Sequence, residues 1–137
     1  VADPGAVAAN YAHQFGIKVV PLVGPSSILL ALMASGMSGQ SFAFHGYLPI
    51  DKLERKKSLQ TLERDVRSRN QTQIFMETPF RNNQLLEAVL ETCHPESLLC
   101  IACNVTGADE YISTQTIKSW KKEKPDLHKK PTIFLLG

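Results

Sequence analysis

The stretch Leu98-Leu99-Cys100-Ile101-Ala102-Cys103 is an unbroken run of six apolar residues. A run of this length and composition is typical of a strand that is buried on both faces, as in sheets that helices cover on each side. The residues that follow it, Asn104-Val105-Thr106-Gly107, are rich in hydrogen-bonding groups and predict a loop. The segment therefore predicts an inner strand of an α/β sheet that ends in a polar loop.

Segments with helical and with strand periodicity alternate on both sides of this run. We expect strands over residues 17–22, 42–48, 73–77, 98–103, 111–115 and 132–136, and helices over residues 4–14, 24–35, 53–69, 79–93 and 117–122. This alternation predicts an α/β fold, a three-layer α/β/α sandwich with a mixed, mostly parallel sheet of about five strands. Ligands bind such sheets beyond the carboxyl ends of the strands, which directs attention to residues 23–27, 77–81 and 104–110.

The start of the chain predicts a domain boundary. Asp3 is expected to cap a helix whose first residue is Pro4, so the sequence begins on a helix cap with almost nothing before it. We therefore expect a piece of a longer protein. Residues 1–24 would be the last helix and strand of an upstream domain. Residues 25–137 would form the α/β domain, with the boundary at Gly24-Pro25.

The composition limits the class of protein. The chain has 137 residues, of which 43% are hydrophobic and 20% charged. These values suit one domain with an ordinary core and exclude a disordered tail, a collagen-like fibre and a disulfide-dense miniprotein. No apolar run approaches the roughly 18 residues of a membrane span, and no signal peptide is visible. Three cysteines, an odd number, suggest a reducing compartment, so we expect a cytoplasmic protein without a membrane partner.

The charge is unevenly distributed although the formal net charge is only +2. Residues 51–69 contain seven basic and four acidic side chains, and residues 118–130 contain six lysines and two acidic side chains. Clusters of this kind suit a polyanionic partner such as RNA, but they also occur on ordinary solvated helix faces and loops. No signature of a known RNA-binding module is present.

Three short segments contain candidate binding or catalytic groups, each with a structural alternative. Gly24-Pro25-Ser26-Ser27 presents hydroxyls and N–H groups that suit an anion or another ligand, or simply an ordinary helix start. Glu77 and Arg81 place a carboxylate at a strand end and a guanidinium in the next helical turn, where they would face a cleft or only pair with each other. The acceptors of residues 104–107 would serve a ligand or the loop itself.

Two further patterns point away from redox and metal chemistry. Cys100 and Cys103 have the spacing of half a redox or zinc site, but within a strand they point to opposite faces, and we expect buried structural cysteines. The four histidines show no ligand spacing. Nothing resembles a Ser-His-Asp set or a phosphate-binding glycine motif. The residues by themselves therefore assign no reaction.

Several segments, taken in chain order, match motifs of one family. They are Val1-Ala2-Asp3-Pro4-Gly5, Val20-Pro21-Leu22-Val23-Gly24-Pro25-Ser26-Ser27, Ala34-Ser35-Gly36, Gly46-Tyr47-Leu48-Pro49 with Glu54-Arg55-Lys56-Lys57, Glu77-Thr78-Pro79-Phe80-Arg81, and Asn104-Val105-Thr106 with Glu110. Together they resemble the carboxyl-terminal part of the tetrapyrrole (corrin/porphyrin) methylase superfamily, most of all its 16S ribosomal RNA 2′-O-ribose cytidine methyltransferases. Phe80, Asn104 and Gly107 depart from that branch, which has histidine, glutamate and lysine there.

The resemblance implies two α/β domains that hold S-adenosylmethionine, the methyl donor, in the cleft between them. The implied cofactor contacts are Asp3, Gly5, Ser26, Ser27, Thr78, Asn104, Val105, Thr106, Pro131 and Thr132. Asp3 and Gly5 would come from a loop of the upstream domain. Glu77 and Arg81 are the candidates for orienting or activating the substrate, and no metal is expected.

The activity implied for the full-length protein is methylation of a ribose 2′-oxygen of a 16S ribosomal RNA cytidine. Its partner would be ribosomal RNA or the small ribosomal subunit, and superfamily members commonly form homodimers, for which the apolar helix at residues 28–34 offers an interface. Two alternatives stay open, a methylase of small tetrapyrrole-like molecules and a non-catalytic binding module. Because the chain would contain only one wall of the cofactor site, we expect residues 1–137 alone to bind S-adenosylmethionine weakly or not at all and to be inactive.

Overall fold

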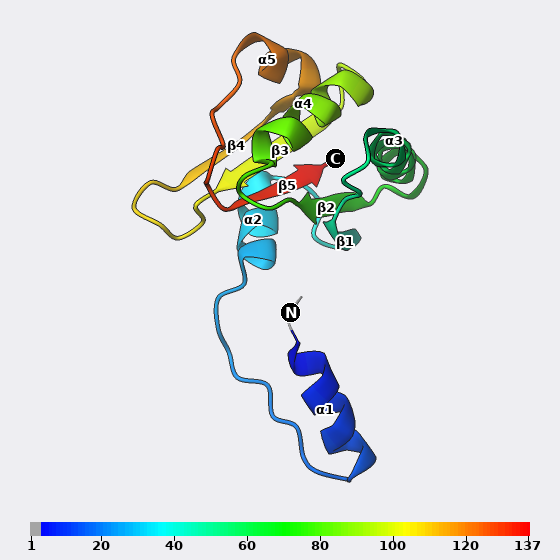
Figure 1. Ribbon diagram of the computed structural model, residues 1–137, viewed down its shortest axis with the longest axis vertical. Coiled ribbons are helices and arrows are strands. Elements are labelled where there is room, and N and C mark those ends of the chain that lie inside the picture. Colours follow the sequence, from blue (N-terminus) through cyan, green and yellow to red (C-terminus); the bar gives the residue numbers. More distant parts are fainter. Residues whose placement is uncertain (1–3) are drawn as a thin grey trace.

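The structure, a computed structural model, describes residues 4–137. The elements in this part of the chain are α1 (Gly5–Gln14), α2 (Ser27–Ser35), β1 (Phe42–Tyr47), α3 (Lys52–Arg69), β2 (Thr72–Met76), α4 (Asn82–Thr92), β3 (Leu98–Cys103), β4 (Tyr111–Thr116), α5 (Ile117–Lys122) and β5 (Thr132–Leu136). Helices α3, α4 and α5 pack on one face of the sheet and α2 packs on the other (Figure 1). The predicted three-layer α/β/α sandwich is confirmed.

The strands form one mixed five-stranded sheet in the order β1-β2-β5-β3-β4. The prediction that this sheet is mostly parallel is wrong, because β1 and β2 are parallel while the other three pairings are antiparallel. Two connections explain the difference. The short loop at residues 104–110 joins β3 to β4, and a parallel pair would need a crossover of a dozen or more residues. Strand β5 then runs back between β2 and β3.

The two faces of β3 are buried in two separate cores, as its sequence predicts. Leu99, Ile101 and Cys103 belong to the larger core beneath α3, α4 and α5. Cys100 and Ala102 belong to the smaller core beneath α2. Cys100 and Cys103 are therefore free, buried and on opposite faces, which confirms the structural interpretation. Burial raises the pKa of the Cys100 thiol, so this side chain stays protonated and unreactive near neutral pH.

The amino-terminal segment lies apart from the sheet (Figure 1). Helix α1 forms as predicted but has no buried residue, and its expected cap Asp3 lies outside the described residues. The predicted strand at residues 17–22 is wrong, because no strand of residues 4–137 lies beside it to accept its backbone hydrogen bonds. Apolar side chains such as Ile17 and Leu22 are exposed as a result. Within residues 4–137, no helix has the combination of length and hydrophobicity that a membrane crossing requires.

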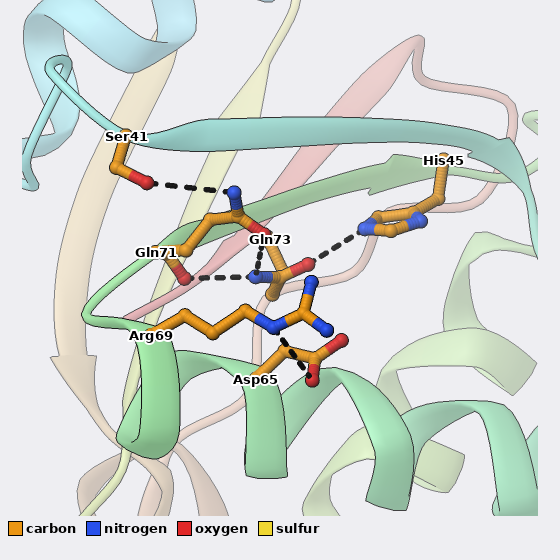
Figure 2. A network of polar contacts seen from close by, with 6 residues as sticks. All are labelled: Ser41, His45, Asp65, Arg69, Gln71 and Gln73. Carbon is orange, nitrogen blue, oxygen red and sulfur yellow. Dashed lines mark hydrogen bonds and ion pairs between the residues drawn. The ribbon is translucent and has the colours of Figure 1, made fainter.

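A polar network fastens the parallel edge strand β1 to β2 beneath α3 (Figure 2). Gln73 on β2 is fully buried, and its amide oxygen lies 2.7 Å from Nε2 of His45 on β1. The same amide donates through Nε2 to the backbone oxygen of Gln71 at 2.9 Å. Because each polar atom of Gln73 has a partner, this buried amide stabilises the pairing instead of opposing it.

The two-core arrangement makes a direct prediction about stability. Leu59 on α3 is completely buried against the sheet, whereas Leu22 is about nine-tenths exposed. Leu59→Ala should lower the free energy of unfolding by about 2–5 kcal/mol, because it leaves a cavity. Leu22→Ala removes the same atoms from an exposed site and should change it by less than about 0.5 kcal/mol. Urea unfolding followed by circular dichroism measures both, and equal effects would mean that residues 17–23 are packed in solution.

Candidate functional site

Three strand ends meet at one end of the sheet and create a cleft. Strands β2 and β3 finish there and antiparallel β5 begins there, with Met76 paired to Ile133 and Cys103 paired to Thr132. A cleft of about 730 Å³ opens beyond these ends. Its walls come from Ser27, from Glu77, and from the segments at residues 104–107 and 129–133.

Most of the residues predicted for the cofactor or the substrate lie at this cleft. The predicted residues that line it are Ser27, Glu77, Asn104, Val105, Thr106, Pro131 and Thr132. Ser26 lines an adjoining hollow of about 510 Å³ that also borders Ser27. Gly5 is not brought to the cleft, because it lies on the separate helix α1, and Asp3 lies outside the described residues (Figure 1).

From the sequence, Glu77 and Arg81 could either face a cleft or only pair with each other. In the structure they form an ion pair, and Glu77 also lines the cleft. The Glu77 side chain is 3% exposed, and its Oε1 accepts hydrogen bonds from Arg81 at 2.8 Å and from the Thr78 backbone N–H at 2.6 Å. Burial acts to raise the pKa of Glu77, but these hydrogen bonds and the Arg81 charge outweigh it, so the pKa lies below its ordinary value. The result is a fixed, ionised carboxylate at the strand end.

The turn after β2 differs from the prediction that Pro79 starts a helix. The Arg81 N–H donates to the Thr78 carbonyl at 2.9 Å, so residues 78–81 form a turn and α4 begins at Asn82. The Pro79 carbonyl is used elsewhere and accepts from the Lys129 N–H at 3.0 Å. This bond ties the turn to the segment that leads into β5.

The loop after β3 is held in a strained conformation by its own hydrogen bonds. Asn104 and Thr106 both have positive φ, at 49° and 68°. The Asn104 side chain donates to Asp109 at 2.6 Å, and its carbonyl accepts from the Gly107 N–H at 2.7 Å. A Cβ atom at Gly107 would lie 2.9 Å from that carbonyl oxygen, so only glycine fits without a shift. Strained backbone of this kind gathers where a binding surface is preformed.

The segment before β5 completes the cleft wall. Lys129 has a positive φ of 60°, which turns the chain back towards the sheet. The Lys130 carbonyl accepts from the Asn82 side chain at 2.7 Å and from the Thr132 hydroxyl at 2.9 Å. The Asn104 N–H donates to the Pro131 carbonyl at 2.8 Å and joins this segment to the loop after β3. The three walls are therefore linked by hydrogen bonds.

Comparison with known proteins gives this cleft a family context. No family model matches the sequence. The chain is 34% identical over 98% of its length to the ribosomal RNA small subunit methyltransferase I of Buchnera aphidicola subsp. Schizaphis graminum, of which it covers 47%. It is 34% identical over 99% of its length to the protein of the same name from Vibrio cholerae, of which it covers 46%.

Over almost its whole length the chain is similar to part of the proteins named ribosomal RNA small subunit methyltransferase I. It spans about half the length of the curated relatives it matches. Among solved structures, the chain is similar to the uroporphyrin-III C-methyltransferase of Thermus thermophilus complexed with S-adenosylhomocysteine. The alignment covers all of this chain and 60% of that protein's chain, with 14% identity and a TM-score of 0.56. At this identity the likeness concerns the fold. The predicted resemblance to ribosomal RNA methyltransferases is confirmed by the two relatives, and the likeness to the uroporphyrin-III C-methyltransferase confirms the fold.

Several residues that line the cleft were not predicted from the sequence. They are Tyr47, Met76, Lys129 and Lys130. The sequence did contain a signal for Tyr47, because the preceding Gly46 lies inside a strand, where glycine often marks a bulge. In the structure the β1–β2 register shifts between Phe44 and Tyr47, and Gly46 has a φ of 65°. The two lysines belong to the basic cluster of residues 118–130, but nothing local places them at the cleft, which they reach because β5 is inserted in the sheet. Within the part of the chain described, no cluster of three His, Cys, Asp or Glu side chains is arranged for a metal.

The Glu77–Arg81 pair predicts a pH-dependent contribution to stability. Because the folded-state pKa of Glu77 lies below its ordinary value of 4.5, the ionised pair stabilises the fold above pH 4.5 and loses this effect as the pH falls through the lowered value. Glu77→Gln should therefore lower the free energy of unfolding near neutral pH by about 1–3 kcal/mol, and the difference should shrink in acid.

The matched control is Glu54→Gln, which removes an exposed ion pair with Lys57. That change should cost at most about 1 kcal/mol. Urea unfolding from pH 7 to pH 3 measures both variants. A Glu77→Gln effect that stays constant over this range would show that the Glu77 charge contributes nothing.

Proposed function

We propose that the full-length protein transfers a methyl group from S-adenosylmethionine to a ribose 2′-hydroxyl of a 16S ribosomal RNA cytidine. One observation carries the proposal: two relatives that share 34% identity over almost the whole chain are named for methylation of small-subunit ribosomal RNA. The cleft supports it, since it unites loops far apart in the sequence. On this proposal the partner is the small ribosomal subunit or its RNA, and the protein works in the cytoplasm.

The cleft suits S-adenosylmethionine in size and chemistry. Its volume of about 730 Å³ falls within the roughly 300–1,000 Å³ of small-molecule sites. Apolar surface from Val105 and Ile133 would contact the adenine, and the Asn104, Asp109 and Thr132 side chains offer polar atoms for the ribose and the amino-acid part. When bound, S-adenosylmethionine supplies an electrophilic methyl group. The proposal assigns Asn104, Thr106 and Thr132 to holding it, together with a wall from the half of the protein that the chain does not span.

Glu77 and Arg81 are proposed to act on the substrate side. A ribose hydroxyl is a weak nucleophile, so its oxygen must be aligned with the methyl group and its proton must find an acceptor. The lowered pKa of Glu77 keeps its carboxylate ionised, so it can accept a hydrogen bond from the ribose hydroxyl, whose proton passes to water as the methyl group is transferred. We therefore assign it to orienting the ribose, with Arg81 fixing the carboxylate and available to a nearby phosphate.

The exposed apolar surface supports an assembly larger than this chain. On the outer side of α2, Met33 is 79% exposed and Leu29 about half exposed. The unpaired segment at residues 17–23 adds further apolar side chains. Exposed apolar patches mark contacts with other domains or subunits. We propose that the upstream half of the protein covers residues 4–23 and that α2 contributes to a homodimer.

The test is methyl transfer by the full-length protein. We expect transfer of isotope-labelled methyl groups from S-adenosylmethionine to small ribosomal subunits, at a ribose oxygen of one cytidine, which nuclease digestion and mass spectrometry locate. Glu77→Gln should reduce the rate by about tenfold or more at unchanged cofactor affinity, while Glu54→Gln should not. Transfer to a porphyrinoid in place of RNA would establish the small-molecule alternative. If the protein binds S-adenosylmethionine but transfers no methyl group to any RNA or porphyrinoid substrate, a binding module is favoured.

A further inference from the structure

A second hollow lies on the helical face, between the start of α3 and α4. It has a volume of about 590 Å³. Helix α3 contributes Lys52, Arg55 and Lys56 to its lining, and α4 contributes Glu87 and Glu91. Neither the fold nor the cofactor cleft requires three cations on one side of this groove.

Arg55 is the unusual member of this groove. It is only 6% exposed, yet its Nε atom is buried without a hydrogen-bond partner. Among residues 4–137, no carboxylate lies within 4 Å of its guanidinium, whereas Arg67, Arg69 and Arg81 each have one. Burial of an unpaired charge is costly, so such a group in a native structure calls for a partner. A planar guanidinium suits carboxylates and phosphates, which it binds through two parallel hydrogen bonds.

The charges around Arg55 favour an external anion. Lys52 and Lys56 are exposed and without an ion pair among the described residues, while Glu87 is paired with Lys124 outside the lining. Glu91 is then the remaining acidic group of the groove. The free N–H groups at the start of α3 do not supply the site, because the Asp51 side chain already accepts from two of them. The cationic side chains of α3 are therefore the binding groups.

The groove also lies next to the proposed active site along the chain. Tyr47 at the end of β1 lines the cofactor cleft, and Ile50, three residues later, lines the groove. Helices α3 and α4 follow the parallel strands β1 and β2, so both helices begin at the end of the sheet where the cleft opens. An RNA strand that enters the cleft would therefore approach this groove from the same end of the sheet.

We propose that this groove binds a backbone phosphate of the RNA substrate, with Arg55 as the two-pronged ligand and Lys52 and Lys56 as flanking charges. The source of the phosphate rests on the proposed function. The groove then contributes to affinity and to the register of the RNA without contacting bases.

Binding of a labelled 16S ribosomal RNA fragment to the full-length protein tests the proposal. Arg55→Gln should weaken binding about tenfold or more and reduce the slope of log affinity against log salt by roughly 0.7, as expected for one lost contact to single-stranded RNA. The matched control is Arg64→Gln on the same helix, an exposed arginine outside the groove with no ion pair in residues 4–137. Equal losses for the two variants would overturn the proposal, because they would reflect net charge alone.

Two variants keep the test valid if Arg55→Gln unfolds. Arg55→Lys retains the charge but not the fork, and should fold and still lose most of the affinity. Glu91→Gln removes the acidic group of the groove and should tighten RNA binding at unchanged thermal stability. A loss of stability in Glu91→Gln with unaltered RNA affinity would show that Glu91 is the internal partner of Arg55, and would overturn the proposal.

Inorganic phosphate separates this proposal from the proposed function. At constant ionic strength it should raise the melting temperature of the unaltered protein but not of Arg55→Gln. If the unaltered protein transfers methyl groups and Arg55→Gln binds RNA with the same affinity as the unaltered protein, the assignment of the groove is wrong and the proposed function stands. Arg55-dependent stabilisation by phosphate, without RNA binding by the unaltered protein, would overturn the assignment to RNA.

Discussion

Strand β5 must be shielded on both faces and paired along both edges, and this requirement organises the rest of the chain. All five of its residues are buried. It pairs with β2 on one side and β3 on the other. Phe134 stacks on Phe75 of β2, with 5.9 Å between ring centroids. The sheet is therefore incomplete without the last residues of the chain, and its central contacts are long-range.

The same insertion creates the cleft. An antiparallel strand between β2 and β3 brings its first residue beside their last ones, so the segment before β5 faces the loops that follow those strands. Positive φ at Asn104, Thr106 and Lys129 bends the chain around this opening. The stability of the two cores supports these strained residues, and the hydrogen bonds between the three walls hold them in place. The topology also places the proposed groove. Helices α3 and α4 follow the parallel strands β1 and β2, so both begin at the end of the sheet where the cleft opens.

Most of the helices and strands could be predicted from the sequence because their periodicity and breakers are local. The run at residues 98–103 behaves as a doubly covered strand, and the elements between residues 42 and 136 fall within a few residues of their predicted bounds. Strand direction and partners are not local. The strand expected at residues 17–22 has the right side chains but no neighbour, and β5 could not be placed beside β2 from its own five residues. For this reason the motif resemblance, and not the periodicity, brought Pro131 and Thr132 into the site. Arg55 was visible in the sequence as part of a charged helix and of a family motif, but its lack of a partner is a property of the packed structure.

The central claim is that the strand-end cleft is the wall that this chain contributes to an S-adenosylmethionine site. A crystal structure of the full-length protein with S-adenosylhomocysteine tests it most directly. The account predicts that the ligand contacts residues 104–107 and Pro131-Thr132, with its sulfur facing the Glu77 carboxylate and a second wall supplied from outside residues 4–137. A ligand bound elsewhere, or bound in the cleft without contact to the loop after β3, would contradict the account.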